Sequence, residues 1–219
     1  MPRRRSRPLL PTLVILALAV GLVLVLRPRL ARPRPAPPPE PKPAPARSLD
    51  PALAARLEPL LDDWLARWRK TDPGFSLARL RALAEYEIET PRPEPELAPD
   101  SAAALLRRRE AAGLISHSPD RSRYIDLNAY AEVVVSRTGT RVYSEPDQLV
   151  ELVDLRRRTR TRLAFHGTAS ATDAARWLDD STVVLCGSSE NPAGARSHRL
   201  PELRLARLNR RTVATYTLP

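Results

Sequence analysis

Apolar residues are distributed in three ways along the chain, and each predicts a different kind of structure. Residues 9–26 are apolar except for two positions near their start and one glycine. From residue 49 to residue 112 the apolar positions recur at the three- and four-residue spacing of helices. From residue 121 onward they form short runs typical of β-strands. The pattern predicts one apolar helix, then a helical region, then a β-rich region.

The apolar run at 9–26 is near the minimum length for a helix that crosses about 30 Å of hydrocarbon. Arginines flank it on both sides: Arg3, Arg4, Arg5 and Arg7 precede it, and Arg27, Arg29, Arg32 and Arg34 follow. No small-x-small cleavage site follows the run directly, so we expect residues 1–27 to stay as a membrane anchor.

The equal arginine flanks leave the orientation undecided by the positive-inside rule. Short N-terminal tails usually stay inside, and proline-rich spacers are typical behind envelope anchors. We therefore expect a single pass through the inner (cytoplasmic) membrane with the C-terminal region extracytoplasmic, which would be periplasmic. Residues 28–48 form the spacer, because their prolines favour an extended polyproline II arm of about 3.1 Å per residue.

The segment 49–89 has the spacing of a helical hairpin. Asp50 followed by Pro51 is a typical helix start, and Pro59 predicts a kink near Glu58. A second helix is expected from Ser76, with apolar positions at Leu77, Leu80, Leu83, Ala84 and Ile88. Trp64 and Trp68 lie on the apolar face of the first helix, which favours a place in the core over a ligand platform.

A second proline-rich break covers 90–100, and the remaining domain covers 101–219. This domain starts with a third helix that ends at about Ala112, before Gly113. The strands expected after it are Tyr124–Leu127, Glu132–Arg137, Arg141–Ser144, Leu149–Leu155, Thr161–Phe165, Thr182–Gly187, Leu203–Leu208 and Thr212–Leu218. The predicted fold class is α+β: an N-terminal transmembrane helix, a Pro-rich linker, a helical hairpin plus a third helix, and a C-terminal antiparallel β-meander sheet.

Two segments of the β-rich region repeat each other. Residues 152–165 align with 205–218, and five of fourteen positions are identical. Upstream, 132–135 corresponds to 182–185. The stretch 175–188, with Trp177 before two aspartates and an apolar strand, resembles the opening of a β-propeller blade of the TolB or WD type. For residues 129–219 this resemblance implies a twisted antiparallel sheet in which Trp177 packs against the strands, with two units where a propeller needs at least four blades.

The net charge of +11 is concentrated in the predicted anchor and spacer. Residues 1–47 carry nine Arg and one Lys against one Glu, a net charge of +9, while residues 48–219 carry 26 basic and 24 acidic side chains. The basic flanks suit anionic head groups, and the nearly neutral folded part lacks the field of a nucleic-acid binder. We expect no nucleic-acid partner.

Candidate catalytic residues do not form a recognisable pattern. His117, His166 and His198 have no metal-binding or zinc-protease spacing, and Cys186 lies in an apolar run that favours a buried, unreactive thiol. No nucleophile elbow or phosphate-binding glycine loop is present in the sequence. We predict no catalytic residues, no metal site and no cofactor.

One dense basic cluster remains outside the anchor: Arg156, Arg157, Arg158, Arg160 and Arg162. It could bind an anionic ligand, or its side chains could simply cover the solvent face of a hairpin. Three hypotheses stay open: a membrane-anchored envelope protein with a non-catalytic interaction or scaffold domain and a protein partner in the envelope, an anionic-ligand sensor that uses the Arg156–Arg162 cluster, and a membrane-associated hydrolase that uses His166 with a carboxylate such as Asp173. The sequence favours the first.

Overall fold

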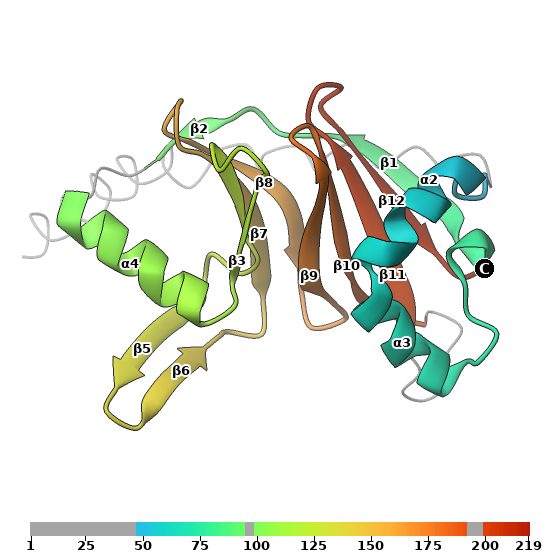
Figure 1. The fold of residues 1–219 in the computed structure, drawn as a ribbon, viewed down its shortest axis with the longest axis horizontal. Coiled ribbons are helices and arrows are strands. Elements are labelled where there is room, and N and C mark those ends of the chain that lie inside the picture. The colour runs from blue at the N-terminus through green and yellow to red at the C-terminus, as the bar shows by residue number, and fades with distance from the viewer. Residues whose placement is uncertain (1–46, 95–98, 192–198) are drawn as a thin grey trace, which may run out of the picture. The chain divides into compact units, whose positions relative to one another are not determined.

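Two five-stranded antiparallel sheets form the centre of the folded region (Figure 1). The computed structural model describes residues 47–94, 99–191 and 199–219, so the predicted anchor at 1–27 and nearly all of the predicted spacer at 28–48 lie outside the described residues. Sheet A has the order β1 (Arg81–Glu87), β12 (Thr212–Thr217), β11 (Arg199–Arg207), β10 (Thr182–Glu190) and β9 (Ser170–Asp179). Sheet B has the order β2 (Arg92–Pro93), β8 (Thr159–His166), β7 (Gln148–Asp154), β4 (Arg123–Asp126) and β3 (Ile115–His117).

The two sheets have the same topology. In each, four strands follow one another as an antiparallel meander, and a fifth strand from the preceding segment pairs at the end: β1 in sheet A and β2 in sheet B. A separate hairpin, β5 (Glu132–Ser136) and β6 (Gly139–Tyr143), is inserted between β4 and β7. At the opposite edges β3 and β9 are joined, because Ser116 Oγ donates to the Ala175 carbonyl at 3.0 Å and Trp177 Nε1 donates to the Ser116 carbonyl at 3.0 Å.

The sequence repeat corresponds to two equivalent hairpins. Residues 152–165 form most of β7–β8 and residues 205–218 form most of β11–β12. Arg158 and Arg211, which align in the repeat, both adopt a left-handed backbone with φ of 52° and 54°. The upstream correspondence of 132–135 with 182–185 is wrong as a structural match, since β10 pairs with β11 whereas the strand that pairs with β7 is β4.

The predicted helical hairpin is half correct. Its first arm consists of α2 (Pro51–Leu57), the 3₁₀ turn η1 (Glu58–Leu60) and α3 (Asp62–Thr71), with the interruption at Glu58 that Pro59 predicted. Its second arm is not a helix. After the short 3₁₀ turn η2 (Leu77–Arg79), residues 81–87 form β1, because backbone pairing with β12 takes precedence over the helical spacing of the leucines. The segment predicted as helical therefore contributes a strand to sheet A, and Ser48 forms a β-bridge with Arg81.

A first core lies between the helices and one face of sheet A. It contains Leu49, Leu57, Leu61, Trp64, Leu65, Phe75, Leu77, Leu80, Val184, Cys186, Leu203, Leu205, Ala214 and Tyr216. Trp64 contacts the rings of Trp68 and Phe75 edge-on, which confirms its place in the core, and its Nε1 donates to the Gly187 carbonyl at 3.3 Å. A Cβ at Gly187 would lie 1.9 Å from the Ala171 carbonyl oxygen, so only glycine fits where β10 passes β9.

A second core fills the space between the sheets. It contains Ile88, Ile125, Leu127, Val150, Leu163, Ala164, Ala175, Val183, Leu185, Ala206 and Val213, with Trp177 packed against it. One face of sheet B thus packs on the face of sheet A that points away from the helices. Trp177 packs against the strands, as expected from the sequence.

The other face of sheet B lies toward α4 (Pro99–Ala111), the predicted third helix (Figure 1). This face is charged. Arg109 of α4 donates to Asp126 at 2.6 Å, and both side chains are less than a tenth exposed. On the same face Arg160 bonds Glu94 at 2.9 Å and Glu151 at 3.2 Å.

Helices α2 and α3 pack on the outer face of sheet A, while α4 contacts the edge strand β3 of sheet B and the β5–β6 hairpin. The likeness to propeller blades stays a prediction. Among the described residues, no helix combines the length and apolar character needed to cross a membrane.

Candidate anion-binding site

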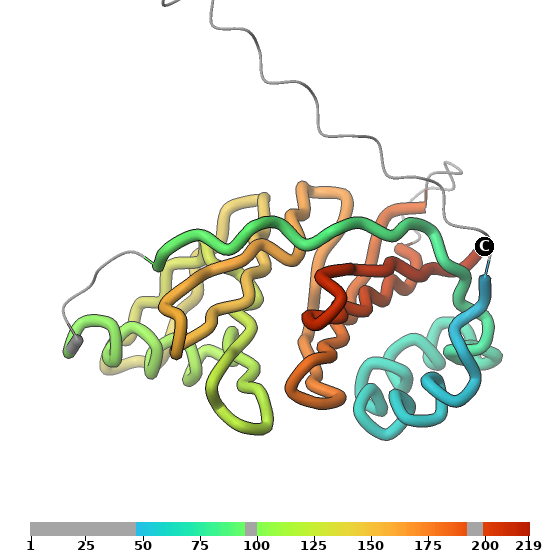
Figure 2. Tube along the Cα trace, turned by 90° about the horizontal axis from the view of Figure 1, so that it is seen from above, coloured from blue at the N-terminus to red at the C-terminus, as the bar shows by residue number. Residues whose placement is uncertain are grey.

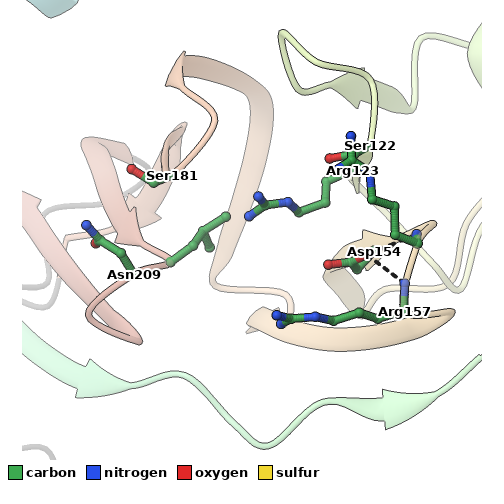
Figure 3. A pocket seen from close by; sticks show the side chains of 8 residues that line it. Ser122, Arg123, Asp154, Arg157, Ser181 and Asn209 are labelled. Carbon is green, nitrogen blue, oxygen red and sulfur yellow. Dashed lines mark hydrogen bonds between the residues drawn. The ribbon is translucent and has the colours of Figure 1, made fainter.

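A pocket of about 420 Å³ opens where the turns of the two sheets meet. Four separate segments line it: the start of β4, the β7–β8 turn, the β9–β10 turn and the β11–β12 turn. The lining residues are Ser122, Arg123, Asp154, Arg156, Arg157, Ser181, Leu208 and Asn209 (Figure 3). The sheets contribute opposite walls, because Ser122 to Arg157 belong to sheet B and its turns whereas Ser181, Leu208 and Asn209 belong to the turns of sheet A.

Asp154 fixes the conformation of the β7–β8 turn. Its carboxylate accepts hydrogen bonds from the backbone N–H groups of Arg156 at 3.0 Å and Arg157 at 2.9 Å. Such a side-chain cap makes a tight turn possible without glycine. The turn then ends on Arg158, whose left-handed backbone returns the chain into β8. The carboxylate therefore holds two arginines in sequence at the pocket.

Further hydrogen bonds hold the other walls of the pocket. Asp120 accepts from the Ser122 hydroxyl at 2.6 Å and from the Ser118 hydroxyl at 2.7 Å, and these hydrogen bonds, that of Ser122 first, hold the pKa of Asp120 well below its usual range. The backbone N–H of Asp120 donates to Asp180 at 3.1 Å, and that of Leu208 donates to the Ser181 carbonyl at 2.8 Å. The first bond links turns of different sheets and the second links two turns of sheet A.

The pocket carries excess positive charge. Three guanidinium groups and one carboxylate line it. In the part of the chain that the structure describes, Arg123 and Arg157 have no carboxylate partner, and Arg156 lies 3.6 Å from Asp120 with 76% of its side chain exposed. Figure 3 shows the side chains of Arg123 and Arg157 extending in the same direction, toward the wall that carries Ser181 and Asn209. This arrangement suits a small anion that accepts hydrogen bonds from two guanidinium groups.

The structure divides the arginine cluster predicted from the sequence. Arg156 and Arg157 reach the pocket, and Arg158 lies exposed at the end of the turn. Arg160 is instead engaged with Glu94 and Glu151 on the outer face of sheet B. Arg162 pairs with Glu89. Only the turn portion of the cluster contributes to this site.

Sequence reasoning missed the other lining residues. Arg123, Ser181 and Asn209 lie far from Arg156 in the sequence and join it only through the packing of one sheet on the other. The one available signal was the repeat, because it aligns the turn after Leu155 with the turn after Leu208.

His166 lies outside this pocket and is buried, with 1% of its surface exposed. Its ring nitrogens bond the Ser170 and Thr172 hydroxyls, both at 2.8 Å. Burial, together with the nearby Arg204, lowers the pKa of His166 to about 3, so the imidazole is neutral at ordinary pH and is too weak a base for hydrolysis. Asp173 bonds Arg67 at 2.8 Å. We therefore base no hydrolase proposal on His166.

Cys186 is buried in the first core, as the apolar run around it predicted. Burial raises the pKa of the Cys186 thiol to about 11, which leaves it protonated at neutral pH. Within residues 47–94, 99–191 and 199–219, no group of three or more His, Cys, Asp or Glu side chains is placed to hold a metal ion.

Comparison of the chain with protein-family models, with curated proteins and with solved structures finds no match.

Proposed function

We propose that this protein is a membrane-anchored envelope protein whose folded region binds an anionic ligand without catalysis. Arg123, Arg156 and Arg157 are the binding residues, and Ser181 and Asn209 on the opposite wall are the additional polar contacts. The ligand class is a compound that carries a phosphate group. This combines the two non-enzymatic hypotheses from the sequence: a displayed interaction domain and an anion sensor.

One observation carries the proposal: two arginines without a carboxylate partner among the described residues extend into the same pocket. Exposed arginines such as Arg107 and Arg141 also lack an ion-pair partner among the described residues, so what distinguishes this site is that two such guanidinium groups meet in one pocket. Other arginines are already paired within the chain. Arg67, Arg79, Arg92, Arg109, Arg160, Arg162 and Arg204 each bond a carboxylate of this chain. The guanidinium groups in the pocket are therefore available to an external anion.

The chemistry of the lining favours phosphate over a simple carboxylate. Phosphate offers several acceptor oxygens in different directions, which suits guanidinium groups that come from two separate segments. The volume, about 420 Å³, lies within the common range of roughly 300–1,000 Å³ for ligand pockets and exceeds what one phosphate group fills. Leu208 supplies an apolar contact for the part of the ligand that carries the phosphate.

The membrane setting rests on the sequence. The apolar run at 9–26 with arginines on both sides supports an anchor, and the prolines that follow support a spacer that holds the folded region away from the bilayer. Phosphate groups are abundant near such a surface, on lipid head groups and envelope polymers. An inner-membrane location with an extracytoplasmic C-terminal region is part of the proposal, and a protein partner in the envelope stays a prediction.

The test is a titration of the full-length protein in detergent micelles with inorganic phosphate and pyrophosphate, followed by isothermal calorimetry at low and high salt. We expect saturable binding that weakens steeply with salt, because the contacts are between charges near the surface. Arg123→Gln and Arg157→Gln should each weaken binding by about tenfold or more, since a charge-assisted hydrogen bond contributes roughly 1.5–3 kcal/mol.

The matched control is Arg107→Gln, an exposed arginine on α4 that does not line the pocket. This variant should bind as the unmodified protein does. Equal binding by the Arg123→Gln, Arg157→Gln and control variants would assign any affinity to general surface charge and overturn the proposed site. Absence of saturable binding of either anion would also overturn it.

A further inference from the structure

The β5–β6 hairpin extends away from both sheets (Figure 1). It exposes apolar side chains on both of its faces. Val134 and Tyr143 are 39% and 53% exposed on one face, and Val135 and Val142 are 53% and 43% exposed on the other. A two-stranded hairpin is marginally stable in water by itself. This one therefore presents apolar surface without having a hydrophobic core of its own.

One long edge of the hairpin is open. Within the described residues β6 pairs with β5 and with no other strand. The two-residue turn closes on the pair Ser136 and Gly139, and alternate residues counted from this pair face β5. The backbone groups of Thr140, Val142 and Ser144 therefore face the open edge. An open edge of this kind is a template for pairing with another strand.

The charges along this edge would complement those of a second, antiparallel copy of the same edge. Arg141 lies on β6, and Glu145 lies two residues after its end; both are exposed and without an ion-pair partner among the described residues. When two copies of this edge pair antiparallel about Tyr143, each Arg141 lies opposite Glu145 of the other copy. The same register places Val142 opposite Ser144, so the backbone groups of these two residues meet in hydrogen-bonded pairs, whereas Thr140 lies opposite Pro146, which has no N–H to donate.

We infer that the open edge of β6 pairs with β6 of a second copy of this chain, in an antiparallel register centred on Tyr143. The two hairpins then form one four-stranded sheet. Each copy contributes an Arg141–Glu145 cross-strand pair, and the two Tyr143 rings meet at the twofold axis. Opposite charges and aromatic pairs directly across an antiparallel ladder both favour pairing.

A second copy fits this edge better than a lipid surface does. Residues 132–145 carry Glu132, Arg137, Arg141 and Glu145, two charges of each sign. Such a segment has no net attraction for anionic head groups. An antiparallel partner with the opposite order of charges satisfies both members of the pair, and the chain itself supplies that order.

Disulfide crosslinking of the full-length protein in membranes tests the register. In the proposed pairing the Tyr143→Cys variant places two thiols directly opposite each other in a non-hydrogen-bonded pair, at a Cα separation of about 4.5 Å that a disulfide can bridge. Thr140→Cys is the matched control, because its thiols would lie about 20 Å apart, six residues out of register. We expect crosslinked dimers from the first variant only. The native thiol of Cys186 does not interfere, since it is buried.

Exchanging the charges of Arg141 and Glu145 tests whether a second copy of the chain pairs with the open edge of β6. By sedimentation velocity in detergent, Arg141→Glu should raise the dimer dissociation constant about tenfold or more, because it places like charges opposite each other. The double variant Arg141→Glu/Glu145→Arg should restore it to within about threefold. The inference is overturned by a monomer at all concentrations, by equal crosslinking at Thr140 and Tyr143, by a dimer that Arg141→Glu leaves unchanged, or by crosslinks from Tyr143→Cys to a different protein.

Discussion

The two five-stranded sheets have the same strand order, yet a face that is apolar in sheet A carries charged side chains at two corresponding positions in sheet B. On the face of sheet A that packs on sheet B lie Leu185, Ala206 and Val213, all buried and apolar. On the α4 side of sheet B the repeat places Val153 and Arg160 at the positions of Ala206 and Val213, and strand pairing places Asp126 at the position of Leu185. Val153 is apolar like its counterpart, whereas Asp126 and Arg160 are charged. The first face is covered by another sheet, whereas α4 lies toward the second and buries Arg109 against Asp126.

The difference shows that the covering element, not the hairpin itself, decides which side chains a face can carry. A sheet covers another sheet over its whole area, so a charge there would be buried without solvent. A helix covers less, and the charged side chains under α4 are either bonded to one another or partly exposed. Tyr124 lies on the same face of sheet B. Burial raises the pKa of its hydroxyl to about 12, so the hydroxyl stays neutral at ordinary pH.

The largest effect is expected from giving sheet A the residue of sheet B. Val213 is fully buried between the sheets and aligns with Arg160. Val213→Arg should prevent folding, with a loss above about 4 kcal/mol, because the guanidinium would have no partner or water there. Leu83→Arg on exposed β1 is the control and should change stability by less than about 0.5 kcal/mol. Circular dichroism during urea denaturation measures the stability of both variants. If Val213→Arg unfolds cooperatively at the same urea concentration as the unmodified protein, the proposed packing of the sheets is wrong.

A smaller loss is expected from opening the ion pair beneath α4. Asp126→Ala leaves buried Arg109 without its carboxylate and should cost about 3–5 kcal/mol. The double variant Arg109→Met/Asp126→Leu gives sheet B the apolar character of sheet A, and should cost far less than the single change. Chemical denaturation of both variants measures the difference. If the double variant is as unstable as Asp126→Ala, an apolar pair cannot replace this ion pair and the prediction is wrong.

The junction between the sheets should be sensitive to acid. His166 ends β8, directly before the loop to β9, and its pKa falls from about 6.5 in the unfolded chain to about 3 in the folded one. The unfolded chain therefore binds more protons between these values, so stability is complete above about pH 6.5 and is lost as the pH falls toward 3. The expected slope is roughly 1 kcal/mol per pH unit. Denaturation curves of His166→Gln should have a shallower acid limb than the unmodified protein; equal limbs would assign acid sensitivity to carboxylates alone.

The smallest effect distinguishes the two equivalent turns. Arg158 and Arg211 both have a positive φ, which costs about 1–2 kcal/mol for a residue with a Cβ. Arg158→Gly relieves this cost and should stabilise the protein by up to about 1 kcal/mol, after the entropy that glycine loses on folding. Arg211→Gly should give no gain, because the Arg211 side chain also donates to the Ile88 and Glu89 carbonyls at 3.0 and 3.2 Å. Thermal melting compares them, and equal shifts would show that those bonds contribute nothing.

Local pattern predicted much of the fold. The third helix and, apart from β9, the strands from β4 onward follow from hydrophobic alternation and turn residues, and the kink at Glu58 follows from Pro59. The strand β1 was predicted as a helix because leucines three residues apart suit both a helix and the 3₁₀ turn that precedes the strand. The strand β9 was missed because alanine, polar and charged residues fill its first seven positions, which gives little hydrophobic alternation.

The candidate site could be predicted only in part. Adjacent arginines in one turn are visible in the sequence, and Arg156 and Arg157 reach the pocket. Arg160 and Arg162 could not be told apart from them, because their carboxylate partners Glu94, Glu151 and Glu89 are distant in sequence. Arg123 joins the pocket through contacts between turns of different sheets, which no local pattern encodes.

The bridge between Ser48 and Arg81 has a practical consequence for how the molecule can be handled. Arg81 also pairs with Thr217, so the first described residues and the carboxyl terminus leave from the same end of sheet A. The β11–β12 turn that borders the pocket lies at the other end of the strands, as the tube in Figure 2 lets the reader follow. A fluorescent reporter or affinity tag fused after Pro219 would therefore emerge on the same side as Ser48 and leave the mouth of the arginine pocket unobstructed.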